Sequence, residues 1–444
     1  MDGASKLTPN DTVIGAEVPV SRLPAAAEIV REYIRASCLT ILDRVGRENA
    51  AAVVVSGSAA LGEMTAVSLD DGGPLVLSDV DLALVVKSDP LRDSVKRMKP
   101  AIMNEIAGHP AASRICPSPD LGVYSLRDLG IQDRKMGVLE LRDSGIVIWG
   151  DAGVLDGLPR FGPEEIPGRE AVALLFNRCL EMLEALEGGF SEDPRRSLLL
   201  LYACAKAYLD SGTALTAYHG RYAPGYGPRL DRTRRVIAER WEDGRDAIPP
   251  EEFLMGLAFW TDFKLDPDLR RVIEKYEIAG GRATLGDAAW RAFLEARLVL
   301  PAVWMALVED QGADAGSGVT GACRSLLGRE PLSARLRGWK RVFTGGGGVP
   351  LSRAARLAFA GSPLHLLRLS AMCLLGGYAS EGKGGRGVPE GTETVVPFLD
   401  KSAAGFLRAY FPGAIESGMR DEDVESWRRL IIEVWRRWTE RFWS

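Results

Sequence analysis

Two aspartates, Asp79 and Asp81, stand one residue apart in the segment SDVDLALVV, whose apolar run predicts a strand. Side chains at positions i and i+2 of a strand point to the same face, so the two carboxylates would lie side by side. Like charges that close repel each other, and burial makes the repulsion more costly. A cation such as Mg²⁺, which takes carboxylate, phosphate and water oxygens, would relieve it. The pair therefore predicts a magnesium site, which Mn²⁺ could also occupy.

A Gly-Ser pair, Gly57-Ser58, ends the preceding apolar run, AAVVVS. Glycine lets the backbone approach a phosphate closely, and the backbone N–H groups and the serine hydroxyl can bind it as a small nest. One element would then hold a polyphosphate and the other a metal ion. Nucleotidyl transfer requires this division of labour.

The order of these elements, SGSAALGEMT followed by LSDVDLALVV, resembles the signature of the DNA polymerase β-type nucleotidyltransferase superfamily. It is most similar to the stand-alone, untemplated branch, which includes antibiotic and minimal nucleotidyltransferases. The resemblance covers about the first third of the chain, and SGIVIWGD at 144–151 resembles the strand that closes the family's domain. It implies that Gly57 and Ser58 bind the triphosphate of an NTP co-substrate and that Asp79 and Asp81 ligate magnesium.

The family pattern also implies a third carboxylate on a neighbouring strand. Asp120 opens a predicted strand at 121–126, and we take it as the third catalytic acid. Its alternative role is that of an ordinary aspartate at the end of a loop. Glu140 is the competitor, but we expect 133–144 to form a helix that Gly145 ends. If neither acid acts, the domain would be a slow enzyme or a nucleotide-binding module without activity.

In related enzymes an all-helical second domain supplies a lysine to the triphosphate. Lys206 is the cation of an apolar helix predicted at 195–211, which we expect to break at Ser211-Gly212. Lys206 is therefore our candidate for binding the triphosphate, and the alternative is a lysine that snorkels from a packed helix. Arg221 and Arg229 could also face the cleft, but we interpret them as solvated loop arginines.

Hydrophobic periodicity divides the chain into three regions. The first, 1–155, is an α+β nucleotidyltransferase domain: a helix at 24–48 and another at 90–108 pack on a small mixed sheet. A Gly- and Pro-rich linker at 150–168 leads into a large all-α region. We expect a substrate-binding domain at 165–340, with helices at 169–188, 195–211, 229–243, 249–262, 267–277 and 285–309. A break at 341–352 leads into a C-terminal helical region at 350–444, with helices at 352–360, 362–377, 402–411 and 421–443.

The C-terminal region holds two motifs that we interpret as structural. An apolar stripe in the last helix, with arginines opposite, could face a membrane surface or a partner, but a docked core is the commoner outcome. The segment GYASEGK at 377–383 fits GxxxxGK, but Gly384 follows where a P-loop has Ser or Thr, and a helix precedes it where a strand is required. We therefore interpret 376–391 as a loop.

Composition narrows the functional classes. The 444 residues carry a net charge of −5, which argues against a protein that coats nucleic acid. The six cysteines are scattered without a CxxC pair, as in a reduced cytoplasmic protein, and the three histidines are not spaced as zinc ligands. No apolar run approaches the ~20 residues of a membrane helix. We expect a soluble, cytoplasmic protein that could form oligomers through its helical region.

The leading function is therefore a magnesium-dependent nucleotidyltransferase that moves a nucleoside monophosphate from an NTP to an acceptor hydroxyl and releases pyrophosphate. A small molecule or a protein side chain is favoured as the acceptor, and an RNA end stays open. One alternative is a catalytically weak or inactive nucleotide-binding module whose helical part binds a partner protein. Another is the nucleotidyltransferase of a toxin–antitoxin pair.

Overall fold

The computed structural model describes residues 18–312 apart from 70–72, 117–119, 187–192, 242–247 and 278–282, together with a few helical residues between 322 and 436. Several predictions lie outside the described residues: the break at 341–352, the helices at 352–360 and 402–411, and the GYASEGK loop. Of the predicted helices at 362–377 and 421–443, the structure describes some residues only.

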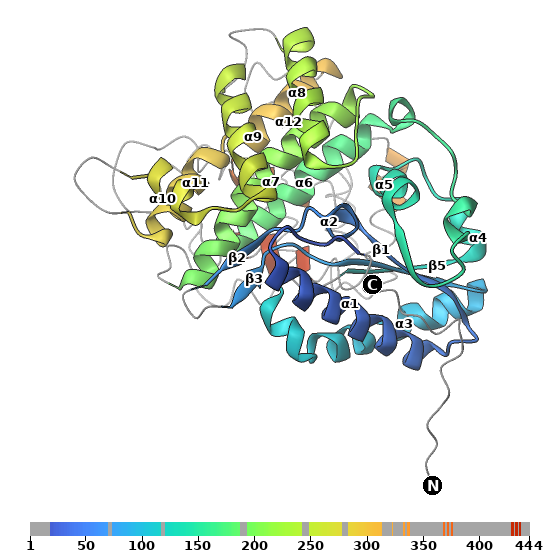
Figure 1. The fold of residues 1–444 in the computed structure, drawn as a ribbon. Coiled ribbons are helices and arrows are strands. Elements are labelled where there is room, and N and C mark those ends of the chain that lie inside the picture. Colours follow the sequence, from blue (N-terminus) through green and yellow to red (C-terminus); the bar gives the residue numbers. More distant parts are fainter. Residues whose placement is uncertain are drawn as a thin grey trace, which may run out of the picture.

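The N-terminal part of the chain is a mixed sheet with helices, as predicted (Figure 1). In chain order its elements are α1 (Pro24–Val45), β1 (Ala50–Ser56), α2 (Gly57–Leu61), β2 (Ala66–Ser68), β3 (Pro74–Val76), β4 (Asp81–Val86), α3 (Asp89–Ala107), β5 (Asp120–Ser125), α4 (Leu126–Leu129), α5 (Met136–Ser144) and β6 (Ile146–Gly150). The predicted helices at 24–48 and 90–108 and the strand at 121–126 thus form α1, α3 and β5.

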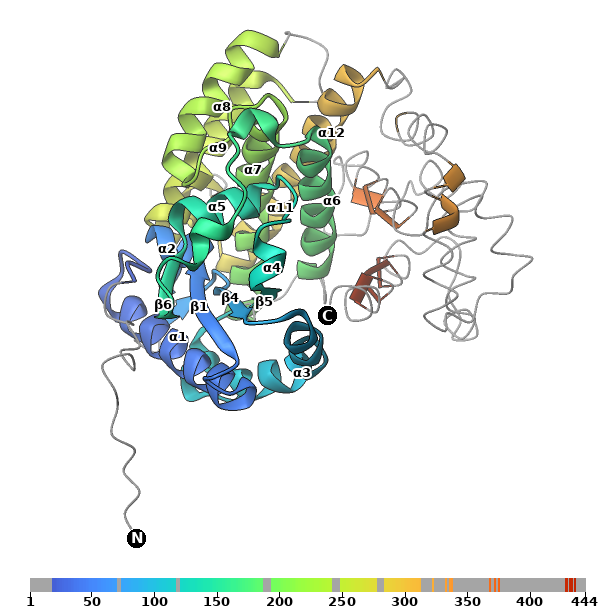
Figure 2. The same cartoon turned by 90° about the vertical axis from the view of Figure 1, so that its right-hand side faces the viewer.

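Four strands form the main sheet in the order β5-β4-β1-β6. β1 is antiparallel to both of its neighbours, and β5 lies parallel to β4 at one edge. Alternate residues of β1 face opposite ways: Val53 and Val55 pack in the core with α1 and α3, whereas Ala52 and Val54 pack in the core of the helical region. Both faces of the sheet are therefore covered, which explains its nearly continuous apolar strands (Figures 1 and 2).

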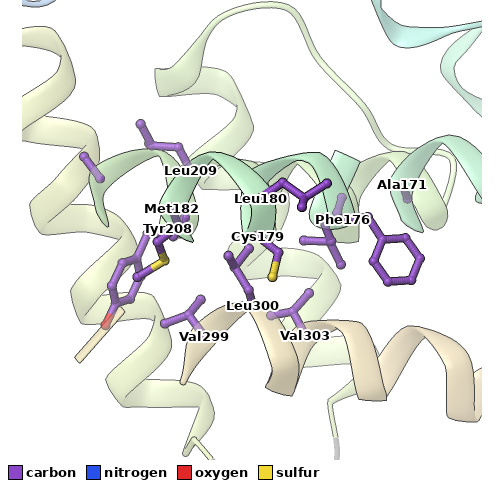
Figure 3. Close-up of a cluster of buried hydrophobic side chains, with 14 of the residues drawn as sticks. Ala171, Phe176, Cys179, Leu180, Met182, Tyr208, Leu209, Val299, Leu300 and Val303 are labelled. Carbon is purple, nitrogen blue, oxygen red and sulfur yellow. The ribbon is translucent and has the colours of Figure 1, made fainter. Parts of the chain in front are cut away.

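The sheet is followed by an all-helical region, also as predicted. Its helices are α6 (Gly168–Ala185), α7 (Pro194–Tyr218), α8 (Tyr226–Arg240), α9 (Pro250–Leu265), α10 (Leu269–Lys275), α11 (Leu285–Ala296) and α12 (Val299–Asp310). α7 is the central helix: it packs against α6, α8, α9, α11 and α12 and is buried on all sides along most of its length. Figure 3 shows side chains of α6, α7 and α12 interdigitating in this core.

Two predicted helix boundaries in this region were wrong. α7 does not break at Ser211-Gly212 but continues to Tyr218. Gly212 serves packing, because a Cβ atom there would lie only 3.0 Å from a methyl carbon of Leu257. The single helix predicted at 285–309 is two helices, α11 and α12. Pro301, which lacks an N–H group, lies one turn after the junction and prevents one continuous helix.

Three further segments differ from their predictions. Part of the loop between β1 and β4 forms the β2-β3 hairpin, and Asp79 lies two residues before β4 rather than within it. The predicted linker at 150–168 is packed, because Leu158, Phe161 and Ile166 are buried in the helical core.

A few residues of the apolar stripe in the last predicted helix, 421–443, are described, and they test whether it docks on the core. Ile431 and Trp435 are buried in the same core as the helical region, as the docked interpretation predicts. Arg428, expected on the opposite face, is also buried and donates to the carbonyl of Leu183 at 3.0 Å. Nowhere in the described part of the chain is a helix both long and apolar enough to cross a membrane.

Candidate active site

A cavity of about 260 Å³ opens between the sheet and the helical region, and both sides line it. The N-terminal side contributes Gly57, Ser58, Leu61, Asp79, Asp81, Met136, Gly137 and Glu140. The helical side contributes Leu174, Arg178, Tyr202, Lys206, Asp210, Thr213, Tyr222, Tyr226, Arg229 and Lys264. Of the predicted site residues, the cavity brings together the Gly-Ser pair, the aspartate pair and the helical lysine. It does not include Asp120.

The aspartate pair has no hydrogen-bond or ion-pair partner among the side chains that the structure describes. Asp81 begins β4 and pairs with Ser56 of β1. It shares the sheet face of Ala83 and Val85, which pack in the core of the helical region. Within the described part of the chain, neither Asp79 nor Asp81 accepts a side-chain hydrogen bond or forms an ion pair. Burial, and then the negative charges of Asp79 and Asp120, raise the pKa of Asp81 to about 8.

These donors fit a magnesium ion. Both supply hard carboxylate oxygens beside a cavity, and neither forms an ion pair with a described residue. In the described residues no three His, Cys, Asp or Glu side chains are grouped closely enough to hold a metal. Two carboxylates therefore suit an ion that takes most of its ligands from phosphate and water, as Mg²⁺ commonly does.

Gly57 occupies a position that only glycine suits. Its φ of +63° lies in the left-handed region, and a Cβ atom there would lie 2.1 Å from Oδ2 of Asp81. The predicted Gly-Ser turn is the first turn of the short helix α2. Ser58 follows with a partly exposed side chain that makes no hydrogen bond to any described residue. The backbone at Gly57 thus lies too close to the Asp81 carboxylate for any side chain to fit between them.

The two candidates for the third carboxylate occupy different environments. Asp120 pairs in register with Asp81 on the neighbouring parallel strand and therefore belongs to the same sheet face. Its side chain is 74% exposed and its Oδ1 lies 3.4 Å from Nζ of Lys99. Glu140 lies on α5, as predicted, and lines the cavity. Its carboxylate is already held by Arg229 at 2.7 Å and by the hydroxyl of Tyr222.

Lys206 faces the cavity from the middle of α7, where only 17% of its side chain is exposed. Its Nζ lies 3.7 Å from Asp210 and donates to the Tyr226 hydroxyl at 3.3 Å. Burial by itself would lower the pKa of Lys206, but the charge of Asp210 and the Tyr226 hydroxyl raise it well above its usual value. Lys206 is therefore a fixed positive charge at the cavity wall.

Most of the other cations of the cavity were not predicted from the sequence. Arg229 was interpreted as a solvated loop residue, which is wrong: it lies in the first turn of α8 and is 7% exposed. It is buried because the rings of Tyr222 and Tyr226 cover its guanidinium, at 5.1 and 4.7 Å. Arg178 on α6 was not identified at all and pairs with Asp210 at 2.6 Å. The side chain of Arg221, by contrast, is 41% exposed and pairs with Glu239 on the surface.

Lys264 was also missed, and it is the most deeply buried cation of the cavity, at 1% exposure. It lies in the last turn of α9, in the segment AFWTDFKL. Burial, and then the charge of Lys206, lower the pKa of Lys264 to about 7. A sequence signal related to that of Lys206 was present, a lysine within a largely apolar helical segment.

Comparison of the chain with known proteins gives no match: no protein-family model, no curated protein and no solved structure resembles it. Any functional conclusion must therefore come from the motifs and the geometry of this cavity.

Proposed function

We propose that this protein is a magnesium-dependent nucleotidyltransferase, which moves a nucleoside monophosphate from an NTP to an acceptor hydroxyl and releases pyrophosphate. One observation carries the proposal: a single cavity joins two unpartnered carboxylates, Asp79 and Asp81, to a wall of buried cations. A metal ion would balance the carboxylates, and a polyphosphate would lie between that ion and the cations.

Each group has a distinct role in the proposed reaction. Asp79 and Asp81 hold the magnesium ion, which when bound supplies Lewis-acid charge at the phosphates. The first turn of α2, at Gly57 and Ser58, and Lys206 bind the triphosphate from opposite sides of the cavity. The acceptor oxygen bonds to the α-phosphorus, and the bond from that phosphorus to the β-phosphate oxygen breaks, so pyrophosphate leaves.

Asp120 is the proposed base that takes the proton of the acceptor hydroxyl. Its support is its place next to Asp81 on the same sheet face, with a carboxylate largely open to solvent. Glu140 is less suited, because a carboxylate that already accepts from Arg229 and Tyr222 is a weaker base. We assign Glu140 to holding Arg229 in the cavity wall.

A second cavity, of about 560 Å³, offers a place for the acceptor. It shares Asp79, Arg178, Tyr202 and Lys206 with the first cavity, so the two adjoin at the proposed reaction centre. Its volume is that of a pocket for one small molecule, roughly 300–1,000 Å³. This favours a small molecule or a single side chain over a long nucleic acid as the acceptor.

The direct test incubates the protein with each α-labelled NTP, magnesium chloride and cell extract, and follows pyrophosphate and labelled products. We expect one or more labelled products from the native protein and none from the Asp79→Ala, Asp81→Ala double variant. Asp133→Ala, an exposed aspartate outside both cavities, is the matched control and should label normally. Equal labelling by the native protein and the double variant would refute the proposal.

A second candidate function, a nucleotide-binding module without transferase activity, is favoured by one observation. Asp120 does not line the cavity, and Glu140 is engaged by two other side chains, so the cavity contains no free third carboxylate among its described residues. Calorimetry distinguishes the two functions: the module would bind an NTP, yet release no pyrophosphate with any extract.

A further inference from the structure

The four cations of the candidate active site differ in how they are neutralised. Arg178 and Lys206 share Asp210, and Arg229 pairs with Glu140. Lys264 alone has no carboxylate within ion-pair distance among the described residues, although it is the most deeply buried of the four. An unpaired buried charge is expensive, so its presence requires an explanation.

Lys264 is the centre of a small hydrogen-bond network that joins the two parts of the molecule. Its Nζ donates to Oγ of Ser78 at 2.7 Å and to the hydroxyl of Tyr202 at 3.1 Å. Its backbone carbonyl accepts from Oγ1 of Thr65 at 3.0 Å, and the backbone N–H of Thr65 donates to Oγ of Ser78 at 2.9 Å. The end of α9 is thereby tied to the residue immediately before Asp79.

The hydroxyls of Ser78 and Tyr202 would keep hydrogen-bond partners without the ammonium group of Lys264. Ser78 and Tyr202 also hydrogen-bond each other at 3.0 Å, and Ser78 keeps the backbone N–H of Thr65 as a donor. The rings of Tyr202 and Tyr226, at 5.4 and 5.2 Å, offset part of the desolvation cost. Removing the charge would leave no polar atom of this network without a partner, so the reason for Lys264 lies outside stability.

We propose that Lys264 is a positioning residue: it holds Ser78 against the helical region and so fixes the Asp79 carboxylate beside Asp81. Asp79 precedes β4, outside the ladder of hydrogen bonds that orients Asp81. Ser78 already bonds to Thr65 and to Tyr202 of α7. Lys264 adds a third hydrogen bond, from α9, so that Ser78 is held from two helices where the sheet does not hold it. The proposal rests on the proposed function in that it takes Asp79 and Asp81 as the metal pair.

The test compares Lys264→Met, which keeps most of the apolar stem, with Lys275→Met. Lys275 is a control for the loss of lysine–aromatic contacts: it also contacts aromatic rings and a tyrosine hydroxyl and lies outside the cavity, and it differs from Lys264 in pairing with Glu295 at 2.8 Å. Each variant is measured for Mn²⁺ binding by electron paramagnetic resonance, for ATP binding in EDTA by calorimetry, and for thermal unfolding. These measurements do not depend on transferase activity, so they test the inference even if no acceptor is found.

For Lys264→Met we expect Mn²⁺ binding to weaken by about threefold or more, while ATP binding in EDTA changes by less than about threefold. The melting temperature should stay within about 2 °C of the native value or rise. Where transfer is measurable, kcat should fall by about tenfold or more with little change in KM for the NTP. Lys275→Met should leave Mn²⁺ and ATP binding unchanged.

Three results would overturn the inference. Tighter Mn²⁺ binding would mean that Lys264 only competes with the metal through its charge. Unchanged Mn²⁺ binding with a lower melting temperature would mean a purely structural role. ATP binding weakened by about tenfold in EDTA would mean that Lys264 binds phosphate directly. If the native protein forms no labelled product, the proposed transferase function is refuted, but the Mn²⁺-binding result for Lys264→Met still stands.

Discussion

The two sides of the candidate active site carry opposite charge. The N-terminal side lines the cavity with three carboxylates, Asp79, Asp81 and Glu140, and no cation. The helical side lines it with four cations and one carboxylate, Asp210. Ligand chemistry should divide in the same way: a metal belongs to the sheet side and an anion to the helical side. The comparison also implies that neither side alone would bind a metal–nucleotide complex well.

The sharpest test of this division replaces one charge on each side. Asp81→Asn should lower the transfer rate by about a thousandfold or more, because the remaining carboxylate cannot hold the metal alone. Lys206→Met should raise KM for the NTP by about tenfold with a smaller loss in kcat, since Lys206 is proposed to contact phosphate. Initial rates at several NTP and Mg²⁺ concentrations give both values. Equal losses in kcat from both variants would contradict a metal side and an anion side.

The second prediction concerns the two candidate acids of the N-terminal side. Asp120→Asn should lower kcat by about a hundredfold, the usual size of a general-base contribution, and leave the melting temperature unchanged because the side chain is exposed. Glu140→Gln should lower the melting temperature more than the rate, because it leaves the buried Arg229 without its carboxylate. Circular dichroism melts and single-turnover rates on both variants check this. The reverse pattern would make Glu140 the base.

The sheet side was the more predictable side, for a physical reason. Its site residues lie at the ends of two adjacent strands, so they appear in the sequence as short motifs beside apolar runs. Gly57-Ser58 spans two residues and Asp79 with Asp81 spans three, and the antiparallel pairing of β1 with β4 brings the two motifs together. The fold class followed from the same alternation of strands and helices.

The helical side could not be predicted in this way. Arg178, Arg229 and Lys264 come from three helices, and only the packing around α7 brings them to one cavity. An isolated arginine near a helix start resembles a solvated residue, as Arg229 did, until the tyrosines that cover it are known. The extent of α7 was missed for a related reason: Gly212 in a strongly apolar run indicates a break, but close packing against Leu257 requires it.

A smaller effect separates two glycines of the cavity wall. Gly57→Ala should cost about 1–2 kcal/mol of folding free energy, because a non-glycine residue at φ +63° is strained, and it should displace Asp81 and lower activity. Gly137→Ala should raise stability by up to about 1 kcal/mol, because Gly137 lies within α5 and a Cβ atom there would have no other atom within 4 Å. Urea denaturation of both variants measures the difference. A neutral Gly57→Ala would show that the close approach to Asp81 is not required.

The smallest predicted effect is a pH dependence that distinguishes the unpaired cation from the paired ones. The pKa of Lys264 is lowered from 10.5 to about 7, mainly by burial and then by Lys206, with Asp79, Glu63 and Asp210 acting in the opposite direction. Below about pH 7 both the folded and the unfolded chain bind the proton, and the cost of the buried charge is constant. Between the folded-state pKa of about 7 and the unfolded-state pKa of 10.5, the unfolded chain binds more protons than the folded chain. Lys264 therefore makes the free energy of unfolding rise with pH in this range.

Lys264→Met removes that contribution and leaves the other titrating groups in place. Its advantage in unfolding free energy over the native protein should therefore be largest near pH 6 and shrink by about 1 kcal/mol or more toward about pH 9. Urea melts of both proteins across this range, without divalent metal, measure the difference directly. The same comparison for Lys206→Met should show no such pH dependence over this range, because Asp210 keeps the pKa of Lys206 well above its usual value and the lysine stays protonated in both the folded and the unfolded chain. If the difference in unfolding free energy between Lys264→Met and the native protein does not vary with pH, the ammonium of Lys264 is compensated in the folded state. The contrast between the paired cations of α6, α7 and α8 and the unpaired cation of α9 would then not be a property of the site.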